Sequence, residues 1–151
     1  MADKYDALLL RRQLCFRLYS TSREVVRRYK PLLDPLNLTY PQYLAMMVLW
    51  EESPLSVKEL GKRLQLDSGT LTPMFKKLEA HGFVKRERSQ DDERVVMISL
   101  TEAGMQLREK AVDVPPCLFS SLGVDPRVAK KLIVARDDFN AQLAQNGASA
   151  S

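Results

Sequence analysis

The side chains of this 151-residue chain best suited to nucleophilic or metal chemistry are two cysteines and one histidine, Cys15, Cys117 and His81. The cysteines lie 102 positions apart and the histidine is near neither, so no zinc-ligand spacing exists. The six glycines form neither GxGxxG nor GxxxxGK[ST], the two phosphate-binding fingerprints. We therefore expect no metal and no cofactor, we consider zinc enzymes and nucleotide-fingerprint enzymes poor candidates, and we assign His81 no special role.

Cys15 falls within a segment, residues 7–30, whose apolar spacing predicts one long helix ended by Pro31 and Pro35. A cysteine on such a helix is often only a small buried apolar residue. A peroxide sensor instead needs the thiolate, which nearby positive charge or hydrogen-bond donors stabilise. Arg11 and Arg12, one turn before Cys15, are candidates for that charge, although long arginines often simply point to solvent.

Tyrosines share the helix face of Cys15. At about 100° per residue, Tyr19 lies about +40° and Tyr29 about −40° from it. Tyr29 is also about 21 Å further along the helix, so it cannot touch the Cys15 of its own chain. It could reach the Cys15 of a partner if the two long helices pack antiparallel across a two-fold axis. The alternative is that these tyrosines are ordinary interface aromatics.

Three helix starts around this segment are signalled by local capping patterns. Thr39 with Gln42 and Ser56 with Glu59 are capping boxes, which predict helices through Trp50 and over residues 57–64. A third helix, from Asp67 or Ser68 to about Ala80, has an apolar stripe and is closed by Gly82. That predicted buried stripe consists of Leu71, Met74, Phe75 and Leu78. Pro73 predicts an irregular or late-starting first turn.

Two strands, 83–88 and 94–100, follow with the polar segment SQDDE between them, the composition of a hairpin tip. Thr101 caps a helix broken at Pro115–Pro116, and Asp125 with Pro126 starts a last helix to about Ala144. The fold class is therefore mainly α with a small β-hairpin wing, in one compact domain. We divide it into a sensing and dimerisation region (1–38), a winged helix-turn-helix (39–101), C-terminal dimerisation helices (102–145) and a disordered tail (146–151).

A short helix pair followed by a β-hairpin describes a winged helix-turn-helix, whose second helix reads the major groove of DNA. Residues 56–101 carry nine basic and seven acidic side chains, within a chain of net charge +4. The alternative is an all-α protein with a charged, soluble hairpin. No targeting or membrane-spanning segment is visible, so we expect a cytoplasmic protein without a membrane partner.

The run SVKELGKRLQLDSGTLTPMFKKLEAHGFVKRERSQDDERVVMISLTEAG resembles the DNA-binding core of MarR-type repressors, and DERVVMISLTEAG resembles that family's wing signature. LCFRLYSTSREVVRRYKPLLDPLNLTYPQYLAMMVLWE with LDSGTLTPMFKKLE is similar to the organic hydroperoxide-sensing (OhrR-type) repressors. The resemblance covers residues 8–110. It implies a homodimer that represses from a pseudo-palindromic double-stranded operator and releases it when organic hydroperoxides oxidise a reactive cysteine.

Carried onto this sequence, the resemblance makes Cys15 the reactive thiolate, approached by Tyr29 and Tyr40 of the other subunit and less directly by Tyr19. Asp92 would brace Arg94, which would enter the minor groove. The residues that we expect to contact DNA are Ser68, Thr70, Thr72, Pro73, Lys76, Lys77, Arg86, Arg88, Asp92 and Arg94.

Cys117 is a candidate resolving cysteine of the partner chain, with a small-molecule thiol as the alternative. Two other functions stay open at this point. One is a MarR-type repressor released by a small aromatic ligand, with Cys15 inert, and the other is a thiol peroxidase that uses the same cysteine.

Overall fold

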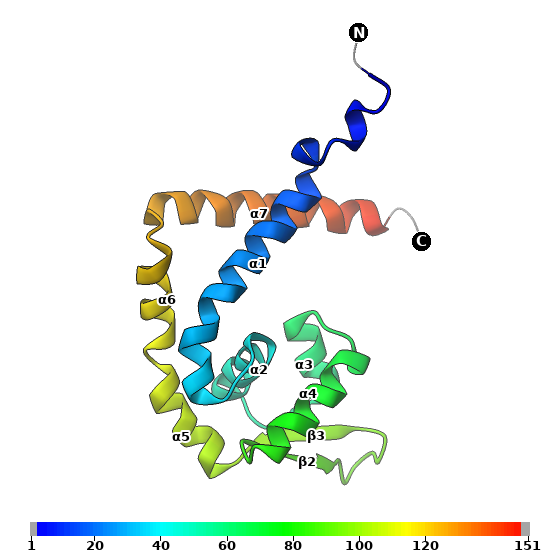
Figure 1. Ribbon diagram of the computed structural model, residues 1–151. Helices are drawn as coiled ribbons and strands as arrows, with labels where there is room; N and C mark the ends of the chain where they lie inside the picture. Colours follow the sequence, from blue (N-terminus) through cyan, green and yellow to red (C-terminus); the bar gives the residue numbers. More distant parts are fainter. Residues whose placement is uncertain (1–2, 149–151) are drawn as a thin grey trace. The chain divides into compact units, whose positions relative to one another are not determined.

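The computed structural model describes residues 3–148, which form seven α-helices and a small antiparallel sheet (Figure 1). They belong to two compact units, one ending at Leu118 and the other starting at Phe119, and each is described by itself. The predicted fold class, mainly α with a β wing, is confirmed. Along the described residues no helix is both long and apolar enough to cross a bilayer.

The first unit begins with two short 3-10 turns, Asp6–Leu8 and Leu10–Arg12, before helix α1 (Leu14–Leu33). The prediction of one continuous helix over 7–30 is therefore wrong at both ends. The side chain of Gln13 donates to the carbonyls of Ala7 (2.7 Å) and Leu9 (3.1 Å), and that of Arg17 donates to the carbonyl of Arg11 (2.7 Å). These bonds occupy carbonyl oxygens that a continuous helix would use for its own N–H groups.

Helix α1 also passes through Pro31, which was expected to end it. A proline removes one N–H, so the carbonyl of Arg27 has no helical partner here, but Arg27 is exposed and water can reach that carbonyl. The chain turns only at a further 3-10 segment, Asp34–Leu36, which holds Pro35 and is closed by Asn37 in the left-handed region (φ 57°). Only the C-terminal turns of α1 contact the core, through buried Leu33 and half-buried Tyr29 and Leu32.

The next three helices start where the capping patterns predict. They are α2 (Tyr40–Glu51), α3 (Val57–Leu64) and α4 (Ser68–Ala80), and both predicted capping boxes are formed. The predicted stripe on α4 is buried throughout. The late start expected from Pro73 is wrong, because α4 begins at Ser68; the carbonyl of exposed Gly69, which loses its helical partner to the proline, lies where water can reach it.

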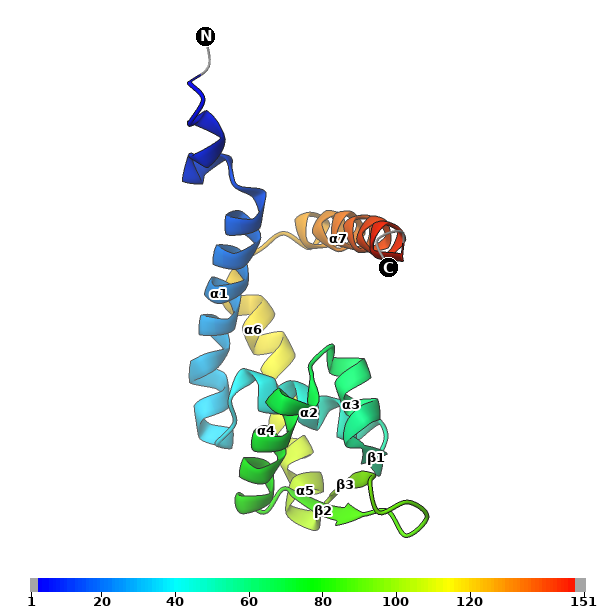
Figure 2. The ribbon, with the colours of Figure 1, turned by 90° about the vertical axis from the view of Figure 1, so that its right-hand side faces the viewer.

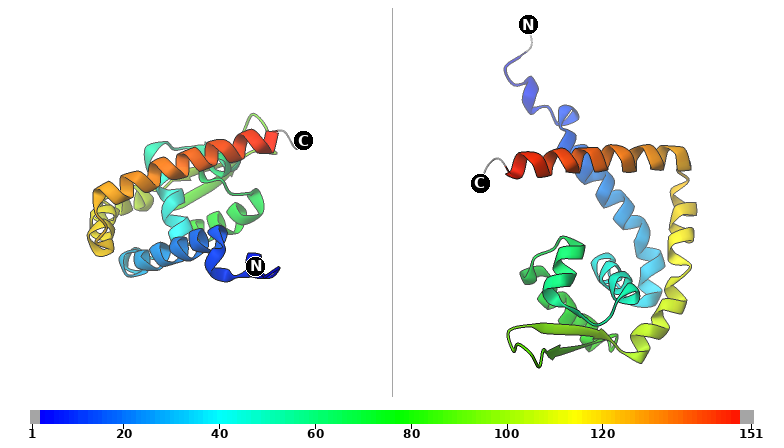
Figure 3. Two further views of the ribbon diagram at one scale, coloured as in Figure 1. Left: turned by 90° about the horizontal axis from the view of Figure 1, so that it is seen from above. Right: turned by 180° about the vertical axis from the view of Figure 1, so that it is seen from behind.

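The sheet has the order β1-β3-β2, with β1 (Leu55–Ser56), β2 (Val84–Arg88) and β3 (Val96–Leu100) all antiparallel. The sequence reading missed β1, because two residues are too few to show a period of two. Strand β3 is central, and its Ile98 is fully buried opposite Leu55 on one side and Arg86 on the other. Figures 2 and 3 show the β2–β3 hairpin beside α3 and α4, the arrangement of a winged helix.

Helix α5 (Glu102–Ala111) leaves the sheet, packs Leu107 and Ala111 into the same core as α2, and is hydrogen-bonded to α2 through an indole. The Nε1 of Trp50 donates to the carbonyl oxygen of Gly104 at 2.9 Å, and the Gly104 N–H is capped by the Thr101 hydroxyl at 3.0 Å. Gly104 is buried against the backbone of Phe83, in the loop before β2. This close backbone contact therefore joins α5 to the loop from which the β2–β3 hairpin begins.

Helix α6 (Val114–Leu122) begins with both prolines in its first turn, where a missing N–H costs no helical bond. Pro115–Pro116 therefore starts a helix, and the break itself lies at 112–113. In the second unit, α7 (Pro126–Ala148) runs four residues beyond the expected end at Ala144. The predicted disordered tail is helical as far as 148, and its last residues, 149–151, lie outside the described residues.

Candidate DNA interface and thiol site

Helix α4 presents a polar face away from the core. Its N-terminus is capped by Asp67, whose carboxylate accepts the Thr70 N–H at 2.7 Å, and this bond holds the pKa of that carboxyl below its usual range. Six residues predicted to contact DNA are all exposed on this helix: Ser68, Thr70, Thr72, Pro73, Lys76 and Lys77. Within residues 3–148, no acidic side chain pairs with the ammonium groups of Lys76 and Lys77, so both charges are available to phosphates.

The two lysines do not occupy the same surroundings. Lys77 lines an open groove of about 450 Å³ together with His81 and Asn37, on the side of α4 that faces the end of α1. The Nδ1 of His81 lies 3.5 Å from the Nδ2 of Asn37. Lys76 lies on the outward face with Pro73, which makes it the more central of the two for contact with a groove.

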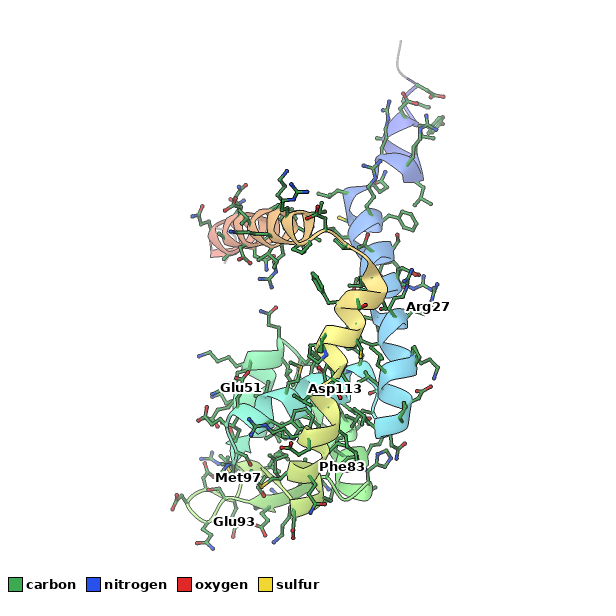
Figure 4. All side chains as sticks on the ribbon, turned by 90° about the vertical axis from the view of Figure 1, so that its left-hand side faces the viewer. Arg27, Glu51, Phe83, Glu93, Met97 and Asp113 are labelled. Carbon is green, nitrogen blue, oxygen red and sulfur yellow. The ribbon has the colours of Figure 1, made fainter. Side chains whose placement is uncertain are left out.

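The wing carries the brace that the resemblance implied. Asp92 accepts the backbone N–H of Arg94 at 3.0 Å and its guanidinium at 3.1 and 3.2 Å, and these bonds lower the pKa of Asp92. The Arg94 side chain is 90% exposed. Arg88 donates to the carbonyl of Glu93 at 2.8 Å, so its charge is oriented without being neutralised. Figure 4 labels Glu93 at the tip of this hairpin.

Arg86 lies differently from the other wing arginines. It is half-buried, and its Nε and backbone N–H both donate to the carboxylate of Glu79 in the last turn of α4. The sequence reading assigned Arg86 to DNA contact and did not single out Glu79. The seven-residue separation crosses from a helix to a strand, so no periodicity could reveal the pair.

A groove of about 710 Å³ separates α3, α4 and the wing. Its lining includes the buried Leu71 and Phe75 and four basic side chains, which are those of Lys58, Lys62, Arg86 and Arg94. A concave surface lined by several basic side chains is suited to the edge of a polyanion.

The second candidate site is the thiol of Cys15, which is free and exposed as the second residue of α1. The residue before the helix, Gln13, makes no side-chain cap. Within residues 3–148 the first-turn N–H groups have neither helical nor capping partners, so the positive end of the helix dipole lies beside Cys15. Arg12 pairs with Asp6 at 3.5 Å, in a 3-10 turn rather than in the helical turn expected.

Tyr29 and Tyr40 do come together, as part of an aromatic cluster at the α1–α2 junction. Their ring centroids are 4.5 Å apart, and Tyr43 lies 5.8 Å from Tyr29 and 6.4 Å from Tyr40. Burial, with smaller effects from the neighbouring phenols, raises the pKa of Tyr29 to about 12. Tyr43 was missed, although its spacing of three from Tyr40 on α2 signals a shared face.

The remaining predicted thiol-site residues lie apart from this cluster. Tyr19 is exposed on α1 with the Arg23 guanidinium 5.3 Å from its ring centroid. Cys117 is a free, exposed thiol on α6. Among residues 3–148, no group of three or more acidic, histidine or cysteine side chains could hold a metal ion.

Comparison with known proteins gives these features a family. The family described as Transcriptional regulator SarA/Rot matches residues 27–111. The organic hydroperoxide resistance transcriptional regulator of Bacillus subtilis is 59% identical over 115 residues, which cover 76% of this chain and 78% of that protein. Reduced AbfR of Staphylococcus epidermidis, solved bound to DNA, is 36% identical with a TM-score of 0.76, over 94% of this chain and 99% of that one.

A disulfide form of AbfR is also similar, at 39% identity and a TM-score of 0.63, over 90% of this chain and 96% of that one. The predicted resemblance is thus confirmed by proteins that match most of the chain. The protein belongs to the MarR family of winged-helix transcriptional regulators, and within it to the organic hydroperoxide-sensing group.

Proposed function

We propose that this protein is a homodimeric repressor that binds a pseudo-palindromic DNA operator and releases it when an organic hydroperoxide oxidises Cys15. The observation that carries the proposal is the position of Cys15, exposed in the uncapped first turn of α1 of a chain that also holds a winged helix. The protein acts in the cytoplasm, where both of its thiols rest reduced.

In the DNA-bound state, α4 lies in the major groove with Thr72, Pro73 and Lys76 toward the bases and phosphates. Arg94, aimed by Asp92, enters the adjacent minor groove. Two copies related by a two-fold axis place their α4 helices about 34 Å apart, one turn of DNA. The small side chains on α4 support this mode, because they let the helix backbone approach the base edges closely.

Apolar side chains left exposed on the second unit support the dimer. Helix α7 exposes Leu132, Ile133 and Val134 as well as Phe139 and Leu143, each by more than two-fifths of its surface. Exposed apolar surface of this extent is typical of a protein–protein interface. The antiparallel pairing of two α1 helices would then bring Cys15 of one subunit to the partner subunit's Tyr29 and Tyr40.

The sensing step is a two-electron oxidation. The Cys15 thiolate attacks the terminal peroxide oxygen, the O–O bond breaks, an S–O bond forms, and the alkoxide takes a proton and leaves as an alcohol. The products are a sulfenic acid on Cys15 and one molecule of alcohol. The Tyr29 hydroxyl, which is protonated at neutral pH like any phenol of ordinary or raised pKa, can hydrogen-bond the thiolate and then the sulfenate.

The sulfenic acid next condenses with a thiol, forming an S–S bond and releasing water. We propose the partner's Cys117 as that thiol. The exposure of both sulfurs supports this, since neither has to be uncovered before they meet. Cys15 therefore acts as a sensor and not as a turnover catalyst, since each oxidation is read out as a change in DNA affinity.

The test uses a DNA duplex selected from a random pool by the reduced wild-type protein, with cumene hydroperoxide as the oxidant. A coupling of about 1–3 kcal/mol predicts that oxidation weakens wild-type binding by about 5- to 150-fold. Cys15→Ser should bind the duplex and ignore the oxidant. If Cys15→Ser is released as fully as the wild type, the mechanism is wrong.

Cys117→Ser separates the two thiols. It should still lose DNA affinity on oxidation, but it should not form the covalent dimer expected for the wild type on a non-reducing gel. A wild-type protein that runs as a monomer, with the mass of a small thiol added to Cys15, would remove Cys117 from the mechanism and leave the sensor in place.

A further inference from the structure

One side chain joins the helix that reads DNA to the wing. The carboxylate of Glu79, in the last turn of α4, accepts the backbone N–H of Arg86 at 2.9 Å through Oε2 and the Nε of the same residue at 3.2 Å through Oε1. Both oxygens are thus used on a single residue of β2. The two elements otherwise meet through apolar contacts such as Phe75, Leu78 and Val84 in the common core.

The position of Glu79 is unfavourable for an acid considered by itself. A negative charge in the last turn of a helix opposes the helix dipole. The bonds to Arg86 compensate for this, and they also satisfy an N–H on β2, which among residues 3–148 is an edge strand paired only with β3. Hydrogen bonds from Arg86 hold the pKa of Glu79 below its usual range, so the carboxylate stays charged at neutral pH.

Arg86 is correspondingly less available to DNA than its neighbours. Its side chain is 28% exposed and already pairs with a carboxylate, whereas the Arg94 side chain is 90% exposed at the tip of the wing. The Nε of Arg86 is committed to this carboxylate, which fixes the direction of the guanidinium, so only its Nη groups are left to donate elsewhere.

We propose that Glu79 and Arg86 are positioning residues that hold α4 and the wing in one fixed relative orientation for DNA binding. Arg86 does not itself contact a phosphate. This inference rests on the proposed DNA-binding function. Two elements whose relative orientation is already fixed lose less conformational freedom when DNA binds, so the pair raises DNA affinity without touching the operator.

A purely electrostatic role and a positioning role for Glu79 predict changes of opposite sign in the DNA affinity of Glu79→Gln. The substitution removes one acid from each protomer and raises the formal net charge from +4 to +5, since 23 − 18 = 5. A purely electrostatic effect would tighten binding to DNA. Loss of positioning should instead weaken it, by about 5- to 30-fold for a dimer that loses two such pairs.

Glu87→Gln is the matched control, because it makes the same change of charge one residue from Arg86 on β2. Glu87 pairs with Lys85 at 2.5 Å, and both side chains are well exposed and bridge no second element. Its affinity for the selected duplex should equal or exceed that of the wild type. Glu79→Gln binding as tightly as Glu87→Gln would overturn the proposal.

The salt dependence of binding tests Arg86 separately. Each lost phosphate contact lowers the slope of log K against log[salt] by about 0.9, or about 1.8 for a dimer. Arg86→Gln should weaken binding and leave this slope unchanged, whereas Arg88→Gln, on the same strand with its charge free, should lower it. A slope reduced by about 1.8 in Arg86→Gln would place Arg86 on a phosphate and refute the assignment.

Hydrogen exchange of the free protein provides a readout that needs no DNA. The Arg86 amide should exchange faster in Glu79→Gln and at the wild-type rate in Glu87→Gln, with thermal melting confirming that both variants fold. Unchanged exchange in Glu79→Gln contradicts the inference. If the Arg86 amide exchanges faster in Glu79→Gln but the wild-type protein binds no duplex, only the proposed DNA-binding function is contradicted.

Discussion

Replacing Gly104 by alanine should strongly destabilise this protein, although the same change inside a helix usually stabilises. A Cβ built at Gly104 overlaps the carbonyl oxygen of Phe83 and lies 3.0 Å from its carbon. Both are backbone atoms, so no side-chain rotation can relieve the overlap, and either α5 or the strand that follows Phe83 must move.

The magnitude follows from what that movement disturbs. Overpacking costs about 1–3 kcal/mol. The shift also strains the bond from Trp50 and the Thr101 cap, each contributing about 1 kcal/mol. The better helix propensity of alanine returns about 1 kcal/mol. We expect a net loss of about 2–4 kcal/mol in the free energy of unfolding and a melting temperature lower by about 5–15 °C.

The assay is thermal and urea unfolding at one fixed protein concentration, because dimerisation makes stability depend on concentration. Gly147→Ala is the control, since its Cβ meets nothing within 4 Å, and it should be neutral or slightly stabilising. Gly61→Ala should fall between the two, with its Cβ 2.8 Å from the Leu66 carbonyl and 2.9 Å from a movable Leu71 methyl. A Gly104→Ala protein as stable as Gly147→Ala would refute the reasoning.

Three further predictions concern single side chains. Burial raises the pKa of Tyr29 from 10.0 to about 12, so the folded state resists ionisation of this phenol. The free energy of unfolding of the wild type should therefore fall as the pH rises from 10 toward 12. Urea titrations across that range should show a smaller fall for Tyr29→Phe. Asp92→Asn should lower DNA affinity by less than Arg94→Gln while leaving the melting temperature unchanged, since it loosens an exposed brace. Lys76→Gln should reduce the salt slope of DNA binding by about 1.8 per dimer with oxidant sensitivity intact, and an unchanged slope would remove Lys76 from the interface.

Elements started by a local capping pattern were predictable from the sequence. The starts of α2, α3 and α4 follow from side chains three residues apart, which reveal themselves without knowledge of the tertiary fold. The start of α1 was not predictable in this way. Its apolar spacing continues upstream, and only the bonds from Gln13 and Arg17 to earlier carbonyls show where the helix begins.

The candidate site likewise contains residues that were predictable from the sequence and residues that were not. The exposed face of α4 follows from helical periodicity, and the pairing of Asp92 with Arg94 followed from the family resemblance. Glu79 and Tyr43 were missed because their roles depend on which element packs beside them. Arg86 was assigned to DNA contact from its place in the basic hairpin, and the sequence does not show that its Nε pairs with Glu79.

The bond between Trp50 and Gly104 also gives the protein a built-in optical probe. The chain has one tryptophan, and its indole N–H is fixed to a backbone carbonyl where α2 meets α5. When excited at wavelengths that the five tyrosines do not absorb, the protein therefore emits from this joint alone. Separation of α5 from α2 exposes the ring to water and shifts the emission to longer wavelength, so this separation can be followed without attaching a dye.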